Sequence, residues 1–354
     1  MRMQVSASMM PEHPSKSSDH DFHAYAAAGA AALHRWYSRR TGRWRTTGWW
    51  NAANALTAVT DYTDRTGDRT FAWVISWTFR VARWRHARFV NNFFDDNGWW
   101  ALAWVRAYEL TGNEHYLAAS RRIFDDMTTG WDETCGGGLW WNQDRKYKNA
   151  IANELFLAVA ARLHRLSPGA GSYYLDWAMR EWDWFSASGM IGPGGLVNDG
   201  LTADCQNNGR PTYTYNQGVI LGGLGDLYEI TGDGAYLRRG ERIADAVLTE
   251  LTTPGSAAQP GILIEPGEPE MAGRRGDSNQ FKGVFARNLG DFYARSSRPA
   301  YREFLVRNAR SLWHNSRNAQ NQFGLCWAGP FDRADASRQS SALDVLTAAV
   351  RVTL

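Results

Sequence analysis

Two kinds of hydrophobic pattern alternate along the chain. Residues 214–230 are apolar or small on every side, whereas in residues 235–251 Tyr236, Ile243 and Val247 form an apolar stripe opposite several arginines. A helix that is apolar all round is buried, and an amphipathic helix covers it with one face. The alternation therefore predicts buried inner helices that are each covered by an outer helix.

Helix ends are marked by a repeated signal. Several apolar segments end in Thr-Gly-Asp or Thr-Gly-Asn, where the glycine can adopt the left-handed cap conformation and the Asp or Asn can begin the next helix. Inner helices are predicted near residues 49–65, 96–110, 148–166, 214–230, 280–295 and 338–352. Outer helices are predicted near residues 22–40, 69–88, 114–129, 171–187, 235–251 and 300–316.

Six pairs of helices are typical of an all-α fold, a closed (α/α)6 barrel. An open solenoid is the rival architecture, but solenoids show tighter repeats and polar terminal caps. Short strands are expected only within loops, at residues 137–141, 195–199 and 261–265. No linker interrupts the pattern, so we expect a flexible segment at 1–20 and one catalytic domain over 21–354.

The connections between helices are asymmetric in length. Turns from inner to outer helices are short, whereas the segments that lead back from outer to inner helices are long. In a ring of parallel inner helices these long loops all lie at one mouth, and functional residues concentrate on such loops. The long loops cover residues 89–97, 130–147, 188–213, 252–279 and 317–337.

Composition excludes several classes of protein. The 39 Lys and Arg residues against 36 Asp and Glu give a net charge of only +3, without a basic run, so neither nucleic acid nor an anionic membrane is an expected partner. The longest apolar stretch, 24–33, is too short to span a bilayer, and membrane insertion is not expected. The N-terminus lacks the apolar run of a signal peptide. We therefore expect a cytoplasmic monomer, with secretion as the alternative if a signal was removed.

The cysteine and histidine spacings do not match a zinc site, so no metal and no cofactor are expected. Cys135 and Cys205 both lie in the long loops. A bridge between them is conceivable, but buried free thiols are the default expectation.

Two neighbouring carboxylates, Asp95 and Asp96, stand at the start of a predicted inner helix among aromatic residues. Helix capping is the ordinary reason for an aspartate there. A second pair, Asp125 and Asp126, ends an outer helix and is expected to be solvated. Glycoside cleavage needs two carboxyl groups, one ionised and one protonated. Burial or a nearby like charge raises the pKa of a carboxyl group, so that it can keep its proton at neutral pH. Asp95 and Asp96 are therefore the candidate catalytic residues.

The chain is rich in aromatic residues, with 18 Trp, 14 Tyr and 15 Phe. Aromatic rings either pack a core or form platforms on which sugar rings stack. Of two adjacent tryptophans, at least one is expected to face the core, because neighbouring side chains point in different directions. The stacking candidates are Trp50, Trp99, Trp140 and Tyr215.

The segment Phe94-Asp-Asp-Asn-Gly-Trp-Trp resembles the signature of glycoside hydrolase family 76, the endo-α-1,6-mannanases. The resemblance runs from about residue 36 to 346, and the other segments that carry it are Cys135-Gly-Gly-Gly-Leu-Trp-Trp, Tyr147-Lys-Asn-Ala-Ile-Ala-Asn-Glu-Leu, Leu196-Val-Asn-Asp-Gly-Leu, Tyr213-Thr-Tyr-Asn-Gln-Gly-Val, Phe281-Lys-Gly-Val-Phe-Ala-Arg-Asn-Leu and Gln339-Ser-Ser-Ala-Leu-Asp. It implies an (α/α)6 barrel that cleaves α-1,6-linked mannan or its oligosaccharides with retention, through a covalent mannosyl-enzyme. It also implies Asp95 as nucleophile and Asp96 as general acid/base.

Further polar residues are candidates for sugar binding. Asp199 matches an active-site position of the family, although Asn-Asp-Gly is also a turn sequence. Asn149, Asn216 and Gln217 lie at inner-helix starts, where amides suit the paired donors and acceptors of a sugar and where capping is the alternative. Lys282 can orient a carboxylate, although a solvated lysine is the more ordinary expectation.

Three other functions stay open at this point. A transglycosylase would use the same site with a sugar acceptor in place of water. A sugar epimerase would need histidine acid/base pairs at the mouth, but the histidines fall in the N-terminal segment, in outer helices or at inner-helix ends away from it. A mannan-binding protein without catalysis would not need the intact aspartate pair.

Overall fold

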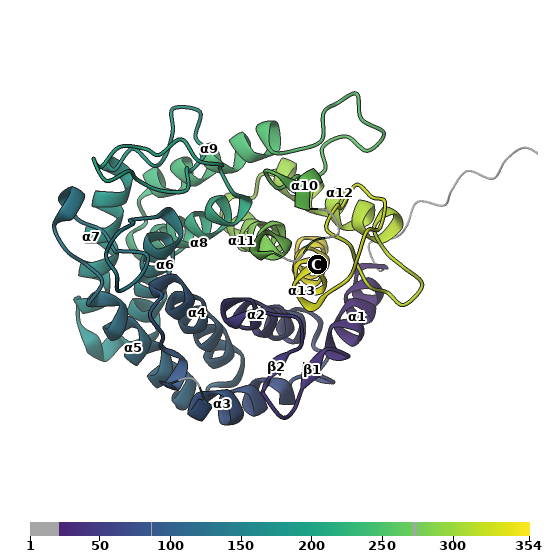
Figure 1. The fold of residues 1–354 in the computed structure, drawn as a ribbon, viewed down its shortest axis with the longest axis horizontal. Coiled ribbons are helices and arrows are strands. Elements are labelled where there is room, and N and C mark those ends of the chain that lie inside the picture. Colours follow the sequence, from purple (N-terminus) through teal and green to yellow (C-terminus); the bar gives the residue numbers. More distant parts are fainter. Residues whose placement is uncertain (1–20, 86, 272–273, 275) are drawn as a thin grey trace, which may run out of the picture.

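The inner helices form a closed ring in the computed structural model, which describes residues 21–85, 87–271, 274 and 276–354 (Figure 1). The expected flexible segment 1–20 lies outside the described residues. The inner helices are α2 (Trp49–Thr66), α4 (Phe94–Thr111), α6 (Ala150–Leu166), α8 (Thr214–Thr231), α11 (Phe281–Ser296) and α13 (Ala336–Thr353). Each packs against the next, and α13 packs against α2, which closes the ring.

A second set of helices surrounds this ring. The outer helices are α1 (Asp21–His34), α3 (Trp73–Arg85), α5 (Glu114–Thr128), α7 (Tyr173–Ala187), α9 (Gly234–Glu250) and α12 (Pro299–Asn315). Most of them rest in the groove between two inner helices, as α5 does on α4 and α6 and as α12 does on α11 and α13. The predicted all-α (α/α)6 barrel is confirmed, and the open solenoid is wrong because the first and last inner helices meet.

Close approach of the inner helices explains their small residues. A Cβ on Gly218 would lie 2.6 Å from the Cα of Phe285, and a Cβ on Gly283 would lie 2.4 Å from the Cα of Ser341. Glycine at these positions lets α8, α11 and α13 pack backbone to backbone. Although the inner helices are apolar, none of the helices in the described ranges is long and apolar enough to cross a membrane.

The Thr-Gly-Asp signals act as predicted. Gly112 and Gly232 end α4 and α8 in the left-handed conformation, with φ of 68° and 72°. The side chains of Asn113 and Asp233 then accept hydrogen bonds from backbone N–H groups of α5 and α9. One short sequence thus ends an inner helix and caps the outer helix that follows.

Ion pairs fill the end of the ring at which the inner helices terminate. Asp226 accepts hydrogen bonds from Arg162, Arg165 and Arg295, which come from two neighbouring inner helices. Arg106 pairs in the same way with Asp61 of α2. Because each buried charge has a partner of opposite sign, this end is closed by a polar layer, and the other end is left for a site.

The small elements differ from the prediction. Helix α1 ends at His34, and the next residues form a hairpin of β1 (Tyr37–Ser38) and β2 (Arg43–Trp44) that the hydrophobic pattern did not indicate. The three predicted loop strands are wrong, since residues 137–141, 195–199 and 261–265 contribute only isolated bridges. The remaining short helices are η1 (Ala87–Phe89), η2 (Thr134–Gly136), η3 (Pro168–Ala170), α10 (Glu268–Met271) and η4 (Asp277–Gln280).

Candidate active site

A cavity of about 220 Å³ opens at the mouth where the inner helices begin. It is lined by Trp50, Asp95, Trp99, Trp141, Tyr147, Asn149, Asp199, Arg210, Tyr215, Asp277 and Phe281. The predicted residues Asp95, Asp199 and Asn149 therefore meet here, although they are far apart in sequence. Within the described part of the chain, no cluster of three or more His, Cys, Asp or Glu side chains is placed to hold a metal ion.

Asp95 and Asp96 occupy the first turn of α4, which follows Phe93 as N-cap residue. Burial first, and then the charge of Asp96, raise the pKa of Asp95 to about 8, while hydrogen bonds from Trp141 and the backbone lower it in part. Oδ1 of Asp95 is buried and has no hydrogen-bond partner among the residues that the structure describes.

Burial likewise raises the pKa of Asp96, to about 6, with a further contribution from the charge of Asp277 and an opposing one from an Asn91 hydrogen bond. At neutral pH the two aspartates therefore hold about one proton between them. Two carboxyl groups in different protonation states are what acid/base chemistry at a glycosidic bond requires.

Asp199, which also lines the cavity, is held in place by its neighbours. Tyr147 donates its hydroxyl to Oδ2 of Asp199 across 2.6 Å, and the guanidinium of Arg210 lies 3.8 Å from the same oxygen. A Cβ on Gly200 would lie 2.5 Å from the Tyr147 hydroxyl oxygen. The glycine of this Asn-Asp-Gly sequence is therefore needed because Tyr147 passes close to the backbone, and its φ is not in the left-handed region.

Two of the predicted amide ligands have other roles. Asn149 both caps α6, by accepting from the backbone N–H of Ala152, and lines the cavity. The prediction that Gln217 binds sugar is wrong. Its side-chain amide accepts from the N–H of Val197 and donates to the C=O of Val197, and so anchors a loop. Asn216 is fully buried and does not line the cavity, although within the described residues neither polar atom of its side-chain amide has a hydrogen-bond partner.

Four aromatic rings form one continuous wall of the cavity. Ring centroids are 5.7 Å apart between Trp50 and Trp99, 6.4 Å between Trp99 and Tyr215, and 3.8 Å between Tyr215 and Phe281. Three of these residues were predicted. Phe281 was not named as a stacking residue, although its motif was noted.

The prediction for Trp140 is wrong, because its neighbour Trp141 faces the cavity. The Trp140 indole instead donates to Asp132 across 2.7 Å, and the ammonium of Lys148 lies 4.9 Å from the centre of its ring. Trp141 packs against Phe93 at the rim. At least one member of the pair was expected to face inward, but the sequence did not identify which of the two would line the cavity.

Two buried lysines organise the mouth loops. Lys148 donates to the carbonyl oxygens of Gly137 and Gly138 at 2.6 and 2.9 Å. Lys282 pairs with Glu268 at 2.6 Å and donates to the carbonyl oxygen of Leu325 at 2.8 Å. The expectation of a solvated Lys282 is wrong, since it is 1% exposed.

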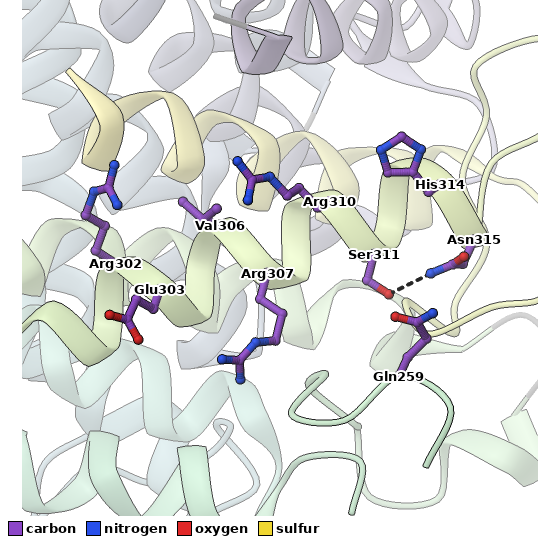
Figure 2. Close-up of a pocket in the computed structure, with 9 residues that line it drawn as sticks. All are labelled: Gln259, Arg302, Glu303, Val306, Arg307, Arg310, Ser311, His314 and Asn315. Atoms are coloured by element: carbon purple, nitrogen blue, oxygen red, sulfur yellow. Dashed lines mark hydrogen bonds between the residues drawn. The ribbon is translucent and has the colours of Figure 1, made fainter. Parts of the chain in front are cut away.

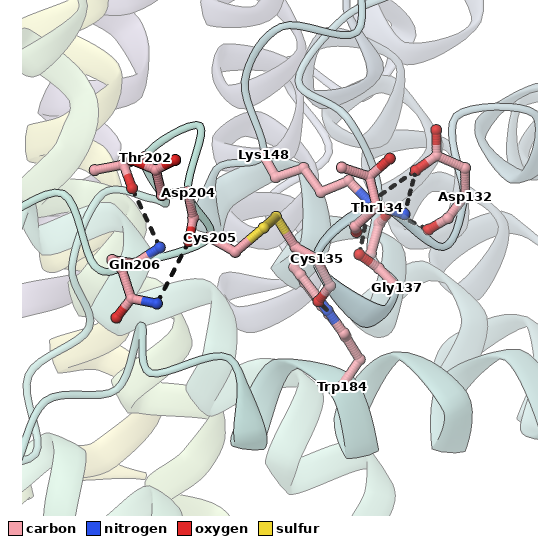
Figure 3. Close-up of a disulfide and its surroundings, with 11 residues drawn as sticks. Asp132, Thr134, Cys135, Gly137, Lys148, Trp184, Thr202, Asp204, Cys205 and Gln206 are labelled. Carbon is pink, nitrogen blue, oxygen red and sulfur yellow. Dashed lines mark hydrogen bonds and ion pairs between the residues drawn. A yellow bond between two sulfur atoms is a disulfide. The ribbon is translucent and has the colours of Figure 1, made fainter.

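A disulfide joins Cys135 and Cys205, so the default expectation of free thiols is wrong for this pair (Figure 3). Cys135 lies in η2, in the loop that continues to Trp141 and Tyr147. Cys205 lies at the tip of a narrow loop that begins at Asp199. The bridge therefore ties together two loops that each supply part of the cavity wall.

The second aspartate pair is only partly solvated. Asp125 is exposed as expected, but Asp126 accepts a hydrogen bond from Asn97, a fully buried residue of α4, across 3.0 Å. Asp126 therefore helps to hold α4 in place. In the sequence, the polar residues Asn91 and Asn97 on either side of Asp95 and Asp96 are the signal that could have indicated this support.

A larger cavity of about 550 Å³ lies along the outer helix α12 and shares no lining residue with the mouth cavity. Arginines dominate it, but they do not converge. Arg302 and Arg310 point to one side of the helix and Arg307 points to the other (Figure 2). This arrangement lacks a common point at which the three charges would meet a ligand.

Comparison with known proteins identifies the family. The family model described as Glycosyl hydrolase family 76 matches residues 23–352. The chain belongs to glycoside hydrolase family 76. Mannan endo-1,6-alpha-mannosidase DCW1 of Eremothecium gossypii is 29% identical over 307 residues, which cover 79% of this chain and 64% of the relative. The chain thus spans slightly less than two thirds of the length of this relative.

Solved structures share the fold of this family 76 chain. The GH76A alpha-1,6-mannanase from Salegentibacter sp. HEL1_6 superposes with a TM-score of 0.83 at 25% identity and covers 94% of this chain and 100% of that one. An inactive variant of the same mannanase, with two adjacent aspartates replaced by alanine, is described in complex with alpha-1,6-mannotetrose. Dfg5 from Chaetomium thermophilum has a TM-score of 0.81 at 22% identity, over 95% of this chain and 91% of that one.

Proposed function

We propose that this protein is an endo-acting hydrolase of α-1,6-linked mannan that retains the anomeric configuration. The observation that carries the proposal is the pair Asp95 and Asp96, which lies at an aromatic-walled cavity and holds about one proton at neutral pH. Membership of family 76 supports it, as does the mannanase that becomes inactive when two adjacent aspartates are replaced.

The proposed reaction is a double displacement. A carboxylate oxygen of Asp95 bonds to the anomeric carbon while the glycosidic C–O bond breaks and the leaving oxygen takes the proton of Asp96. Asp96 then takes a proton from water, the water oxygen bonds to the same carbon, and the bond to Asp95 breaks. The first step takes one proton from Asp96 and the second step returns one, and the two inversions give overall retention.

The assignment of roles follows from position. Asp95 lines the cavity, and the start of α4 directs backbone N–H groups towards its carboxylate. The pKa values of about 8 and about 6 by themselves favour the proton on Asp95. The positive charge that develops on the anomeric carbon favours ionised Asp95, and the charge of Asp95 then favours a proton on Asp96.

The walls suit a neutral sugar. The rings of Trp50, Trp99, Tyr215 and Phe281 offer faces for stacking, and aromatic-lined pockets with a few polar groups are typical of ligand sites. Asp199 and Asn149, which line the same cavity, provide acceptors and donors for sugar hydroxyl groups. We propose α-1,6-mannan or its oligosaccharides as the substrate.

The test is hydrolysis of linear α-1,6-mannan oligosaccharides, followed by NMR of the anomeric protons. Initial products with the α configuration are expected from the wild type. Asp95→Asn and Asp96→Asn should each lower kcat by at least about 1000-fold, since each step loses its reacting group. Asp125→Asn, at the exposed aspartate of the other pair, is the matched control and should leave the rate unchanged. Full activity in either catalytic variant, or β products, would sink the proposal.

The same experiment separates the other functions. Addition of a second sugar as acceptor would divert product into longer chains if the enzyme is a transglycosylase. An epimerase would change the substrate without shortening it, and no histidine lines the cavity that would serve that chemistry. Tight binding without turnover by the wild type would identify a binding protein.

We further propose that the protein works as a monomer in an oxidising compartment. The Cys135–Cys205 bridge supports the secreted alternative over the cytoplasmic one, because disulfides persist outside the reducing cytoplasm. Mass spectrometry of the native protein after alkylation should find these two cysteines unmodified. Recovery of both cysteines as free thiols would contradict the proposed oxidising compartment. A dimer mass in light scattering would contradict the proposed monomeric state.

A further inference from the structure

Asn91 contacts the catalytic pair from the loop before α4. Its Nδ2 donates to Oδ2 of Asp96 across 2.6 Å, and its Oδ1 accepts from the backbone N–H of Phe93 across 2.8 Å. A side-chain amide has donors only on nitrogen and acceptors only on oxygen. Because the Phe93 N–H holds the oxygen, the nitrogen of Asn91 has to face Asp96.

The backbone of Asn91 is fixed by the helix that it serves. Asn97 accepts from the N–H of Asn91 at 2.8 Å through Oδ1 and donates to its C=O at 3.2 Å through Nδ2. Asn97 is fully buried, directly follows Asp96 in α4, and also donates to Asp126 of α5. The donor and the acceptor of the Asn91–Asp96 bond are therefore held by the same turn of α4.

This bond distinguishes the two oxygens of Asp96. Within the described part of the chain, the side-chain hydrogen bond that acts on Asp96 comes from Asn91 and is made to Oδ2, not to Oδ1. An amide does not titrate in the range in which enzymes work, so this N–H is present in every protonation state of Asp96. A proton on Asp96 is therefore disfavoured on Oδ2.

We propose that Asn91 is a positioning residue for Asp96: it occupies Oδ2 and leaves Oδ1 as the oxygen that gives and takes the proton. The inference rests on the proposed function, in which Asp96 is the acid/base. In the first step the O–H bond at Oδ1 breaks and the leaving sugar oxygen receives the proton. In the second step Oδ1 receives a proton from the water that bonds to the anomeric carbon.

The charged groups around Asp96 give this bond a second effect. Asp95 of α4 lies beside it and Asp277 of η4 faces it, whereas Asp126 lies behind Asn97 with Arg122 as its own neighbour. Burial and the charge of Asp277 raise the pKa of Asp96, and the Asn91 bond opposes them by stabilising the ionised form. Loss of the bond should therefore raise this pKa further.

The experiment compares wild type, Asn91→Ala and Asn91→Asp in the pH dependence of kcat/KM on an α-1,6-mannan oligosaccharide. Because Asp96 has to be protonated in the first step, a higher pKa moves the alkaline limb to higher pH. For Asn91→Ala we expect the alkaline limb to shift by about one pH unit, because one hydrogen bond to a charged group is lost. For Asn91→Asp we expect a larger shift, because a second carboxylate then stands beside Asp96. The matched control is Asn92→Ala, at an exposed neighbour, which should keep the wild-type profile.

The outcomes are distinguishable. A wild type that leaves mannan intact would contradict the proposed function itself. A wild type that cleaves mannan, with Asn91 variants that are slower but keep the wild-type pH profile, would overturn only the role of Asn91 and show a structural one. If Asn91→Ala does not fold, by circular dichroism, Asn91→Asp decides, because it keeps the acceptor for the Phe93 N–H.

Discussion

Tyr147 donates its hydroxyl to Oδ2 of Asp199 across 2.6 Å, and Asn208 in turn donates to the Tyr147 oxygen across 2.8 Å. These three residues come from two loops that are also joined by the Cys135–Cys205 bridge. The contact fixes a carboxylate that lines the same cavity as Asp95.

Tyr147→Phe should therefore weaken the enzyme through Asp199. Loss of one hydrogen bond to a charged group costs about 1.5 kcal/mol, so we expect kcat/KM on mannan oligosaccharides to fall about tenfold. Tyr228→Phe, at the far end of α8, is the control and should leave kcat/KM unchanged. Equal values for wild type and Tyr147→Phe would show that Asp199 does not contact the sugar.

Replacement of Asp95 should stabilise the protein at neutral and alkaline pH. The raised pKa means that folded Asp95 holds its proton up to about pH 8, whereas an unfolded aspartate loses it near pH 4. The folded state therefore binds more protons, and stability falls as pH rises between these values. We expect Asp95→Asn to melt a few degrees higher than wild type at pH 8 and equally at pH 4, in scans by circular dichroism. Asp204→Asn, at an exposed loop, is the control, and a Tm gain that does not depend on pH would contradict the burial of the Asp95 charge.

Removal of the disulfide should affect both stability and binding. The bridge closes a loop of 70 residues, and in the chain-entropy account a bridge of this length is worth about 4 kcal/mol. In urea unfolding, the double variant Cys135→Ser/Cys205→Ser should have a free energy of unfolding lower by roughly this amount. It should also show a higher KM, because the loop with Asp199 is no longer tethered. Cys326→Ser, at the free thiol, is the control for cysteine replacement. An unchanged KM would show that hydrogen bonds alone hold the loop.

The ion pairs at the closed end of the barrel should matter for stability alone. Asp226→Asn leaves Arg162, Arg165 and Arg295 without their shared anion, and the loss of one partner from a buried network costs about 3–5 kcal/mol. We expect a large drop in the urea midpoint with kcat/KM unchanged at temperatures where the variant is folded. Asp64→Asn, at the more exposed edge of the network, should cost much less. A selective loss of kcat/KM would contradict the separation of the two ends.

The sequence by itself determined the helices and singled out Asp95 and Asp96 as candidates. The hydrophobic pattern of residues 214–230 and of residues 235–251 is local, and so are the Thr-Gly-Asp caps, so both could be interpreted without contacts from distant segments. Asp95 and Asp96 could be singled out for the same reason, because their neighbours in the sequence are also their neighbours at the mouth.

Only the tertiary structure decided how the loop residues are used. Trp141 rather than Trp140 faces the cavity because Trp140 is held by Asp132 and Lys148. The side-chain amide of Gln217 is hydrogen-bonded to the backbone of Val197, twenty residues earlier in the chain. Cys135 and Cys205 pair across 70 residues. Loops have no repeating geometry that fixes the direction of a side chain, so contacts made after the ring closes decide it.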